Sequence, residues 1–300
     1  MHVVTPLVRS TPLSAALGAE VWLKLEALQP SGSFKLRGVG RACRRARERG
    51  ARAVVSSSGG NAGLAAAVAG RALGLPVTVV VPATTSPRMR GLLAAEGAAV
   101  RVEGAVWDEA HAAAVALAAA SGAFLVHPFE GEDLWEGHAT LVAEAAVQGP
   151  RPDAVVCAVG GGGLLGGVLR GLAAAGWADV PVVAAETEGA ASFAAAWAAG
   201  EVVTLPAITS IATSLGARRV SEAVFAAARR REVRPAVVSD AEALDACARF
   251  ADAHRLLVEP ACGAALAPVL AGHPALAGAR TVWVVVCGGA GVTRATLAGR

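Results

Sequence analysis

The 300-residue sequence lacks the patterns that would assign it to a secreted or nucleic-acid-binding class. Its five cysteines are scattered and form no CxxC pair, which argues against a zinc site or a disulfide framework and favours a reducing compartment. The formal net charge is +3, and the short basic runs at 44–49 and 229–231 are typical of solvated helix faces. We therefore expect small-molecule partners and no nucleic acid.

Long hydrophobic runs are also missing. The mean hydropathy is +0.51, but the apolar runs are short or broken by glycine, whereas a membrane span needs about 20 uninterrupted apolar residues. Residues 1–6 have neither the charged region nor the long apolar core of a signal peptide. These absences predict a soluble, cytoplasmic protein without a membrane partner.

Short apolar runs alternate with alanine-rich helical segments along the chain. This alternation predicts an α/β fold in which parallel sheets are covered by helices on both faces. No repeat period and no low-complexity linker marks a domain boundary. The clearest expected strands are 77–81, 99–102, 124–126, 155–159, 182–185 and 282–286.

The segment Ser31–Arg37 isolates one lysine among small and apolar neighbours, directly after the strand-like run 21–26. Burial disfavours the charged amine and lowers its pKa, which a Schiff-base lysine needs in order to act as a nucleophile and then as a proton carrier. Lys35 is therefore a candidate catalytic residue. The plain alternative is a solvated surface lysine.

A second segment, 56–63, follows the apolar run 53–55 and leads into an alanine-rich helix. Backbone N–H groups in the first turn of a helix, with serine hydroxyls beside them, can bind a carboxylate or a phosphate. Serine and asparagine are also ordinary helix caps, so capping and binding both stay open on the residues alone. The candidates for binding are Ser57, Ser58, Gly59, Gly60, Asn61 and Ala62.

A third segment places four glycines, Gly160–Gly163, between a buried-strand pattern at 154–159 and a helix. Successive glycines let the backbone approach an anion, and the helix start favours a phosphate. The segment also matches a dinucleotide fingerprint, with Glu186 where a ribose-binding acid would stand. A nicotinamide enzyme has no use for the other two segments, whereas one phosphorylated aldehyde, pyridoxal phosphate (PLP), would use all three.

Several motifs in order make the chain resemble the PLP-dependent fold-type II lyases, and among them the L-serine dehydratases of the serine/threonine ammonia-lyase group. The resemblance implies a fold similar to the tryptophan synthase β subunit, with two open, twisted, mostly parallel sheets flanked by helices. It also implies a homodimer, a large PLP-binding domain at 1–36 and 129–300, and a small domain at 37–128. The motifs lie at 29–35, 57–63, 135–139, 160–163, 257–264 and 286–289.

The resemblance further implies roles for single residues. Lys35 would hold PLP and then act as general base at the substrate α-carbon, while the loop 57–62 would bind the substrate carboxylate. Either Ser58 or the cofactor phosphate would protonate the leaving hydroxyl. For Phe34 and Cys287 a plain role in the core is the alternative. The cofactor-binding residues implied are Phe34, Lys35, Asn61, Gly160, Gly161, Gly162, Gly163, Leu164 and Cys287.

A monovalent cation, expected to be potassium, is implied beside the glycine segment. Ligands that are all oxygen suit a hard cation. His127, His138 and His254 are interpreted as structural or surface residues, because no spacing joins them to a carboxylate or to a second ligand. The implied cation ligands are the carbonyls of Gly160, Ala190, Leu215 and Ala217, the Glu186 carboxylate and the Ser192 hydroxyl.

The function implied is that of an L-serine dehydratase, with L-threonine as a second substrate. The alternatives are a related PLP enzyme (a serine racemase or a β-replacement synthase), an NAD-dependent dehydrogenase, and a non-catalytic regulator that binds a cofactor or cation. Related racemases carry a serine immediately before the Gly-Asn pair, where this chain has Gly59, so dehydration is favoured. Since the sequence ends at Arg300, soon after the last expected strand, we expect no effector domain and no control by isoleucine.

Overall fold

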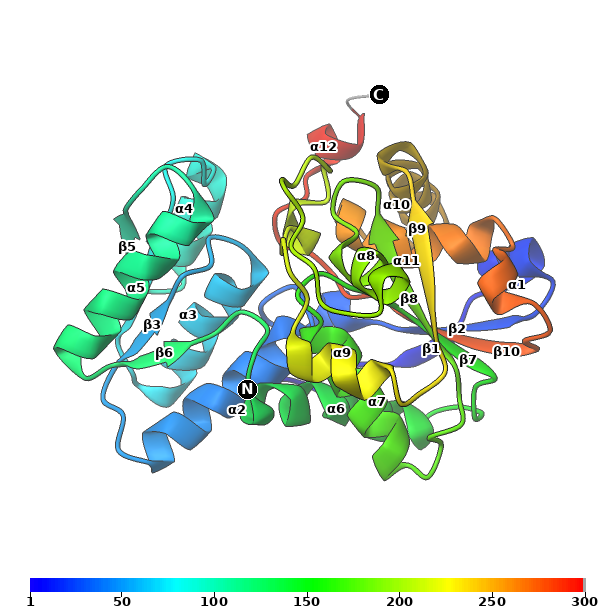
Figure 1. Cartoon of the computed structure of the whole chain (residues 1–300), viewed down its shortest axis with the longest axis horizontal. Coiled ribbons are helices and arrows are strands. Elements are labelled where there is room, and N and C mark those ends of the chain that lie inside the picture. Colours follow the sequence, from blue (N-terminus) through cyan, green and yellow to red (C-terminus); the bar gives the residue numbers. More distant parts are fainter. Residues whose placement is uncertain (299–300) are drawn as a thin grey trace. The chain divides into compact units, whose positions relative to one another are not determined.

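The computed structural model describes residues 1–298, which form two compact units (Figure 1). Unit 1 comprises Met1–Val3 and Gln29–Gly137, and unit 2 comprises Val4–Leu28 and the chain from His138 onward. The main segment of unit 1 begins before residue 37 and ends after residue 128. The boundaries of the expected small domain at 37–128 therefore stay a prediction. Arg300, on which the expectation of no effector domain rests, lies outside the described residues.

Unit 1 is built on a four-stranded parallel sheet. Its elements are α2 (Lys35–Glu48), β3 (Val54–Ser56), α3 (Asn61–Leu73), β4 (Val77–Val81), α4 (Pro87–Ala95), β5 (Ala99–Val102), α5 (Trp107–Ser121) and β6 (Phe124–Val126). The strand order is β5-β4-β3-β6, and every neighbouring pair is parallel. Helices α2 and α3 pack against each other, while α5 packs on β3, β4 and β6. The strands expected at 77–81, 99–102 and 124–126 are confirmed.

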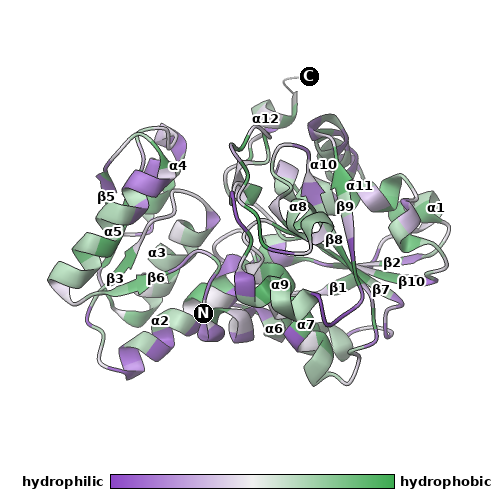
Figure 2. Ribbon diagram, in the orientation of Figure 1, coloured by the Kyte–Doolittle hydropathy of each residue, from purple (hydrophilic) through white to green (hydrophobic). Residues whose placement is uncertain are grey.

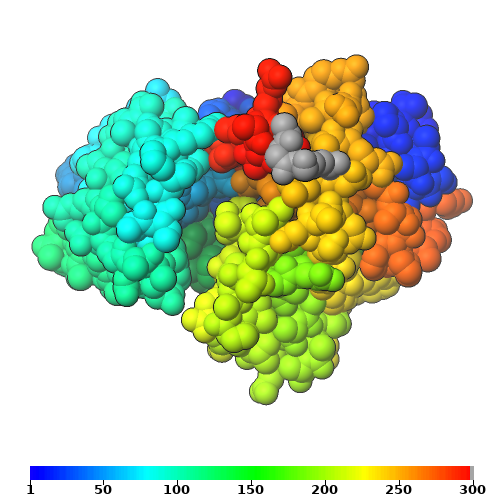
Figure 3. Space-filling view, turned by 90° about the horizontal axis from the view of Figure 1, so that it is seen from above, coloured from blue at the N-terminus to red at the C-terminus, as the bar shows by residue number. Residues whose placement is uncertain are grey.

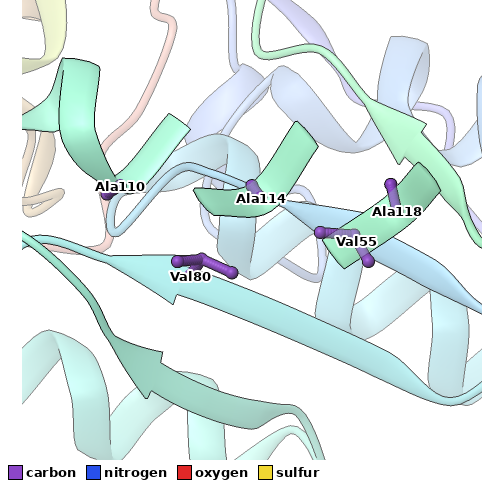
Figure 4. Close-up of a cluster of buried hydrophobic side chains, with 5 residues drawn as sticks. All are labelled: Val55, Val80, Ala110, Ala114 and Ala118. Atoms are coloured by element: carbon purple, nitrogen blue, oxygen red, sulfur yellow. The ribbon is translucent and has the colours of Figure 1, made fainter. Parts of the chain in front are cut away.

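Alanine at every fourth position lets α5 pack closely on this sheet. Ala110, Ala114 and Ala118 are buried against Val55 of β3 and Val80 of β4, as Figure 4 shows. Residues four apart lie on the same face of a helix, so these alanines form one small-residue face toward the strands. The first turn of α5 is thereby held at the edge of the sheet where the parallel strands end.

Unit 2 contains the larger sheet, of six strands. Its elements are β1 (Leu7–Arg9), α1 (Thr11–Leu17), β2 (Glu20–Lys24), η1 (Glu26–Leu28), β7 (Ala154–Ala158), α7 (Gly163–Ala174), β8 (Val182–Thr187), α8 (Ser192–Ala199), η2 (Thr213–Leu215), α9 (Glu222–Ala228), β9 (Val233–Val238), α10 (Asp240–His254), α11 (Pro260–Leu270), η3 (Pro274–Leu276), β10 (Thr281–Val285) and α12 (Arg294–Ala298). Helix α6 (Glu132–Ala146) crosses the boundary after Gly137. The strand order is β1-β2-β10-β7-β8-β9, and only the β1–β2 pair among these strands is antiparallel.

Helices cover both faces of the larger sheet. Helices α7 and α9 pack together on one face, and α10 and α11 pack together on the other (Figure 1). The strands of both sheets are largely hydrophobic, and hydrophilic residues gather on outward helix faces and loops (Figure 2). The connection from α8 to α9 runs over the surface of unit 2, where it is yellow-green in Figure 3. The predicted α/β class, with two mostly parallel sheets flanked by helices, is confirmed.

The five cysteines all lie within residues 1–298 and are free and buried, as expected for a chain without a disulfide framework. No helix in the described part of the chain is both long and apolar enough to cross a bilayer.

Candidate active site

Lys35 is the first residue of α2, and its side chain reaches the segment that follows β6. Its Nζ atom donates a hydrogen bond to the carbonyl oxygen of Pro128 at 2.6 Å. The same atom lies 5.1 Å from the centroid of the Phe34 ring. Both side chains are half-buried, so the amine is partly shielded from water, as the sequence predicts.

The serine segment is the loop between β3 and α3. Ser57 is fully buried, and its hydroxyl lies 2.8 Å from Nδ1 of His111. Ser58 Oγ accepts a hydrogen bond from the Gly60 N–H at 3.3 Å. Because an oxygen that accepts from Gly60 still carries its own proton, the Ser58 hydroxyl remains able to donate to another group.

The start of α3 favours binding over capping for this loop. The N-cap residue is Gly60, which has no side chain with which to cap the first turn. By contrast, serine side chains cap four other helices, α1, α4, α9 and α10. A helix start whose N-cap residue carries no side chain of its own suits a carboxylate ligand.

Close packing requires glycine once in this loop and once in the first turn of α3. A Cβ atom at Gly63 would overlap the carbonyl oxygen of Ser58, and one at Gly59 would lie 2.6 Å from Oγ1 of Thr85. The φ angles of both glycines lie outside the left-handed region. Contact with neighbouring atoms, and not a positive φ angle, therefore excludes larger residues here.

The glycine segment connects β7 to α7. Gly162 is the N-cap of α7 with a φ angle of 94°, which favours glycine, and no described side chain caps this helix. The Ser221 N–H donates to the carbonyl oxygen of Gly161 at 3.1 Å and holds the loop in place. With Gly163 and Leu164 opening the helix, the backbone N–H groups of the first turn fit the phosphate of the expected cofactor.

Cys287 follows β10 and is buried. A hydrogen bond with the Cys262 thiol raises the pKa of Cys287 well above its usual value, and burial raises it further. Nearby Glu259 and Cys247 act in the same direction. The Cys287 thiol therefore stays protonated and uncharged near neutral pH, which is the state expected of a neutral partner for a pyridine nitrogen.

Glu186 and Ser192 lie in the β8–α8 segment of unit 2. The two carboxylate oxygens of Glu186 accept hydrogen bonds from the Phe193 and Ala194 N–H groups, at 2.8 and 2.7 Å. Burial raises the pKa of Glu186 to about 8, although these two hydrogen bonds oppose the increase. Ser192 Oγ is buried and has no hydrogen-bond partner among the described residues. Within residues 1–298 the Glu186 carboxylate has only backbone N–H partners and no cationic one, and this feature and the unpartnered hydroxyl fit a hard cation.

The remaining expected cation ligands also belong to unit 2. Ala190 is buried in the turn before α8, where its N–H donates to the Thr187 carbonyl. A Cβ atom at Gly160 would lie 3.0 Å from Cα of Leu215, so these two residues are in contact. Ala217 donates its N–H to the Leu215 carbonyl at 2.7 Å. Since a carbonyl oxygen has two lone pairs, the Leu215 oxygen can still bind a cation.

Sequence reasoning missed His111. It lies in α5 one turn after Trp107, on which its ring stacks at a centroid distance of 4.7 Å. Its ring is also 5.8 Å from that of His127, in an edge-on arrangement. The available signal is topological: His127 follows β6, Ser57 follows β3, and both strands end at the edge where α5 begins.

The three histidines interpreted as structural each have defined surroundings. His127 Nδ1 accepts hydrogen bonds from the Phe129 and Glu130 N–H groups, at 3.3 and 2.9 Å. His138 is fully buried, and a Cβ atom at Gly167 would collide with it. His254 Nε2 lies 3.0 Å from the hydroxyl of Ser10, which caps α1.

Comparison with known proteins agrees with these features. A family model described as pyridoxal-phosphate dependent enzyme matches residues 2–288. The chain is 46% identical to an L-serine dehydratase/L-threonine deaminase of Bos taurus, over 99% of this chain and 94% of that protein. It superposes on a fungal L-serine ammonia-lyase from Rhizomucor miehei with a TM-score of 0.92 and 37% identity, covering 99% and 97% of the two chains. A maize serine racemase superposes with a TM-score of 0.92 and 27% identity, covering 99% and 91%.

We expect His127 to contribute a pH-dependent part of the stability. Burial, then His111 and Lys35, lower the pKa of His127 from 6.5 to about 4. The folded protein therefore binds this proton less readily than the unfolded chain, and stability present above about pH 6.5 is lost as the pH falls toward 4. His127→Asn keeps a hydrogen-bond acceptor but does not titrate, so it should lose less stability over this range. Urea-unfolding midpoints at pH 7 and pH 4.5 measure the difference, and equal losses in both proteins would contradict the assignment.

Proposed function

Because the chain belongs to the pyridoxal-phosphate dependent enzyme family, we propose that it is an L-serine dehydratase, which converts L-serine to pyruvate and ammonia and takes L-threonine as a second substrate. The names of the bovine and fungal relatives support this substrate class. The observation that carries the proposal concerns lysine. Of the 300 residues only Lys24 and Lys35 are lysines, and the first is already engaged.

Lys24 is held in a buried polar cluster of unit 2. Its Nζ atom donates to the Thr5 carbonyl at 2.7 Å and to Gln148 Oε1 at 3.1 Å, and it is ion-paired with Glu144 at 2.8 Å. An ammonium group has three protons, and these three acceptors use them all. A cofactor aldehyde needs an uncharged amine, so Lys35 is the lysine that can take it.

The position of Lys35 suits both anchoring and proton transfer. Its amine contacts Pro128, two residues beyond the end of β6. Ser56 and Val126, the last residues of β3 and β6, are register partners, so the serine loop starts beside this segment. The Lys35 amine and the serine loop, which we propose to bind the substrate carboxylate, therefore lie at neighbouring strand ends within one unit. This pairing is what a base acting on the α-carbon of a bound amino acid requires.

The other residues take roles consistent with their geometry. The N–H groups from Gly161 to Leu164 would bind the cofactor phosphate, Cys287 would face the ring nitrogen, Asn61 would bond the phenolic oxygen, and Phe34 would pack on the ring. When bound, PLP supplies the electron sink that stabilises negative charge at the substrate α-carbon.

Within the chain, Lys35 Nζ removes the α-proton while the loop 57–61 holds the substrate carboxylate. Ser58, whose proton is free to be donated, protonates the departing β-hydroxyl, with the cofactor phosphate as the alternative donor. The uncharged Cys287 thiol leaves the ring nitrogen without a proton from an acidic partner. Negative charge is then delocalised less into the ring, which favours rapid loss of the β-hydroxyl over reprotonation of the α-carbon.

We also infer a monovalent cation, potassium, bound by Glu186, the Ser192 hydroxyl and the carbonyls beside the glycine loop. The buried carboxylate and the unpartnered hydroxyl support this inference. The free, buried cysteines favour a reducing, cytoplasmic compartment. The homodimer rests on the family resemblance.

The attachment point of the cofactor tests the proposed function. We expect the purified enzyme to absorb near roughly 410–420 nm and to be labelled at Lys35 after borohydride reduction, because no other lysine is available. Lys35→Ala should lose this band and lower pyruvate formation by about a thousandfold or more. Peptide mass spectrometry locates the label. A label on Lys24, or an Ala variant that retains a tenth of the activity, would exclude Lys35 as anchor and base.

The cation is tested by replacing the charged ligand. Glu186→Gln keeps the side-chain length and one acceptor for the α8 backbone but removes the charge, so we expect a loss of response to added potassium. Activity is measured in potassium, sodium and tetramethylammonium chloride at equal ionic strength. Glu242→Gln is the matched control, because Glu242 accepts hydrogen bonds from Ser239 at the start of α10 in the same unit. Equal potassium responses in all three proteins would rule out the site.

The serine racemase alternative is tested at Gly59. A residue here would have to supply a proton on the cofactor face opposite Lys35, and glycine has none to donate. We therefore expect almost no D-serine during turnover, measured by chiral chromatography. Gly59→Ser alone should lose activity because its Cβ atom would press on Thr85. Combining it with Thr85→Ala should restore activity and raise D-serine formation. Appreciable D-serine from the unmutated enzyme would favour the racemase.

A further inference from the structure

The Ser57 hydroxyl is the one loop hydroxyl that pairs with a titratable side chain in the described structure. Ser57 Oγ and His111 Nδ1 are 2.8 Å apart, within normal hydrogen-bond distance. Ser57 is fully buried, while His111 is half-buried. These residues are 54 positions apart in the chain. Their contact is therefore a tertiary interaction that joins α5 to the substrate-carboxylate loop.

The fold holds His111 in place from several sides. Ala110, the residue before it, is buried against the sheet. One turn earlier, Trp107 stacks on its ring, as residues four apart on a helix can do. The ring of His127 lies edge-on to that of His111. With one ring face stacked on Trp107, a second ring beside it and its helix packed on the sheet, His111 presents Nδ1 to Ser57.

His127 also has a fixed protonation pattern. Its Nδ1 accepts from the Phe129 and Glu130 N–H groups, and its lowered pKa keeps it neutral at physiological pH. The proton of a neutral ring must then be on Nε2. His127 thus adds no positive charge next to His111, and the histidine pair is held together by packing.

The direction of the Ser57–His111 hydrogen bond decides what Ser57 can do. A substrate carboxylate only accepts hydrogen bonds, so a serine that binds it must donate its single hydroxyl proton. If Ser57 donated to His111, that proton would be consumed. If Nδ1–H of His111 donates to Ser57 Oγ, the serine proton is left for the carboxylate.

We propose that His111 is a positioning residue for substrate binding, which donates Nδ1–H to Ser57 Oγ and so directs the Ser57 proton to the carboxylate of the amino-acid substrate. This inference rests on the proposed function, since it requires the loop to bind a carboxylate. In this role His111 contacts Ser57 and takes no part in the reaction itself. It acts through Ser57, on the affinity for substrate and not on the chemical step.

The first test separates binding from catalysis. His111→Phe keeps an aromatic ring to stack on Trp107 but removes the donor. We expect KM for L-serine to rise about tenfold with kcat within about twofold, since a hydrogen bond to a charged group is lost. His111→Asn places an amide N–H near the former Nδ1 position and should bring KM back to within about threefold of the unmutated value.

The second test shows whether His111 acts through Ser57. In a Ser57→Ala background the His111→Phe change should alter KM by less than twofold, because its partner is already gone. His254→Phe is the matched control: it removes another histidine–serine contact, at 3.0 Å, in unit 2. We expect this control to leave KM unchanged, even if thermal stability falls.

The outcomes distinguish this inference from the proposed function. If the unmutated enzyme forms pyruvate from L-serine but His111→Phe has an unchanged or lower KM, the positioning role is wrong and the contact only joins α5 to the loop. A fall in kcat alone, or equal effects of His111→Phe with and without Ser57, also overturns it. If the unmutated enzyme forms no pyruvate, the proposed function itself has failed.

Discussion

Parallel strand pairing is the constraint on which the rest of the structure depends. In a parallel sheet all strands end at the same edge, so the segments that follow them are brought together whatever their separation in the chain. In unit 2 the adjacent strands β10 and β7 lead to Cys287 and to Gly160, and the neighbouring strand β8 carries Glu186 near its end. In unit 1 the adjacent strands β3 and β6 lead to Ser57 and to the Pro128 carbonyl that holds Lys35.

Close packing then decides the residue types at these edges. The loop after β3 is tight enough that Gly63 faces the Ser58 carbonyl and Gly59 faces Thr85. The loop after β7 turns with a positive φ angle at Gly162. In both loops the helix that follows has a glycine N-cap, which carries no capping side chain. A helix start of this kind suits an anionic ligand.

The sequence predicted most of the fold and of the motif residues, because strand composition and loop motifs are local properties. The strands β4, β5 and β6 have the predicted bounds, whereas β9 was not predicted: it is an edge strand that contains Pro235 and Arg234, residues that weaken a strand pattern. His111 could not be found from sequence spacing, because its distance from Ser57 depends on the strand order β5-β4-β3-β6. The burial of Ser192 could not be predicted either, because it depends on how the turn before α8 folds.

As with the glycines, local geometry and chemistry explain why lysine and not arginine stands at two positions. Of the 27 lysines and arginines, only two are lysines, and each occupies a position where arginine would not serve. At Lys24 a compact ammonium with three protons meets three acceptors in a buried cluster, which a planar guanidinium would not match. At Lys35 the chemistry needs an amine that can lose its proton, and arginine stays charged. Because arginine supplies the surface cations, no exposed lysine competes for an aldehyde cofactor, and this composition supports the proposed role of Lys35.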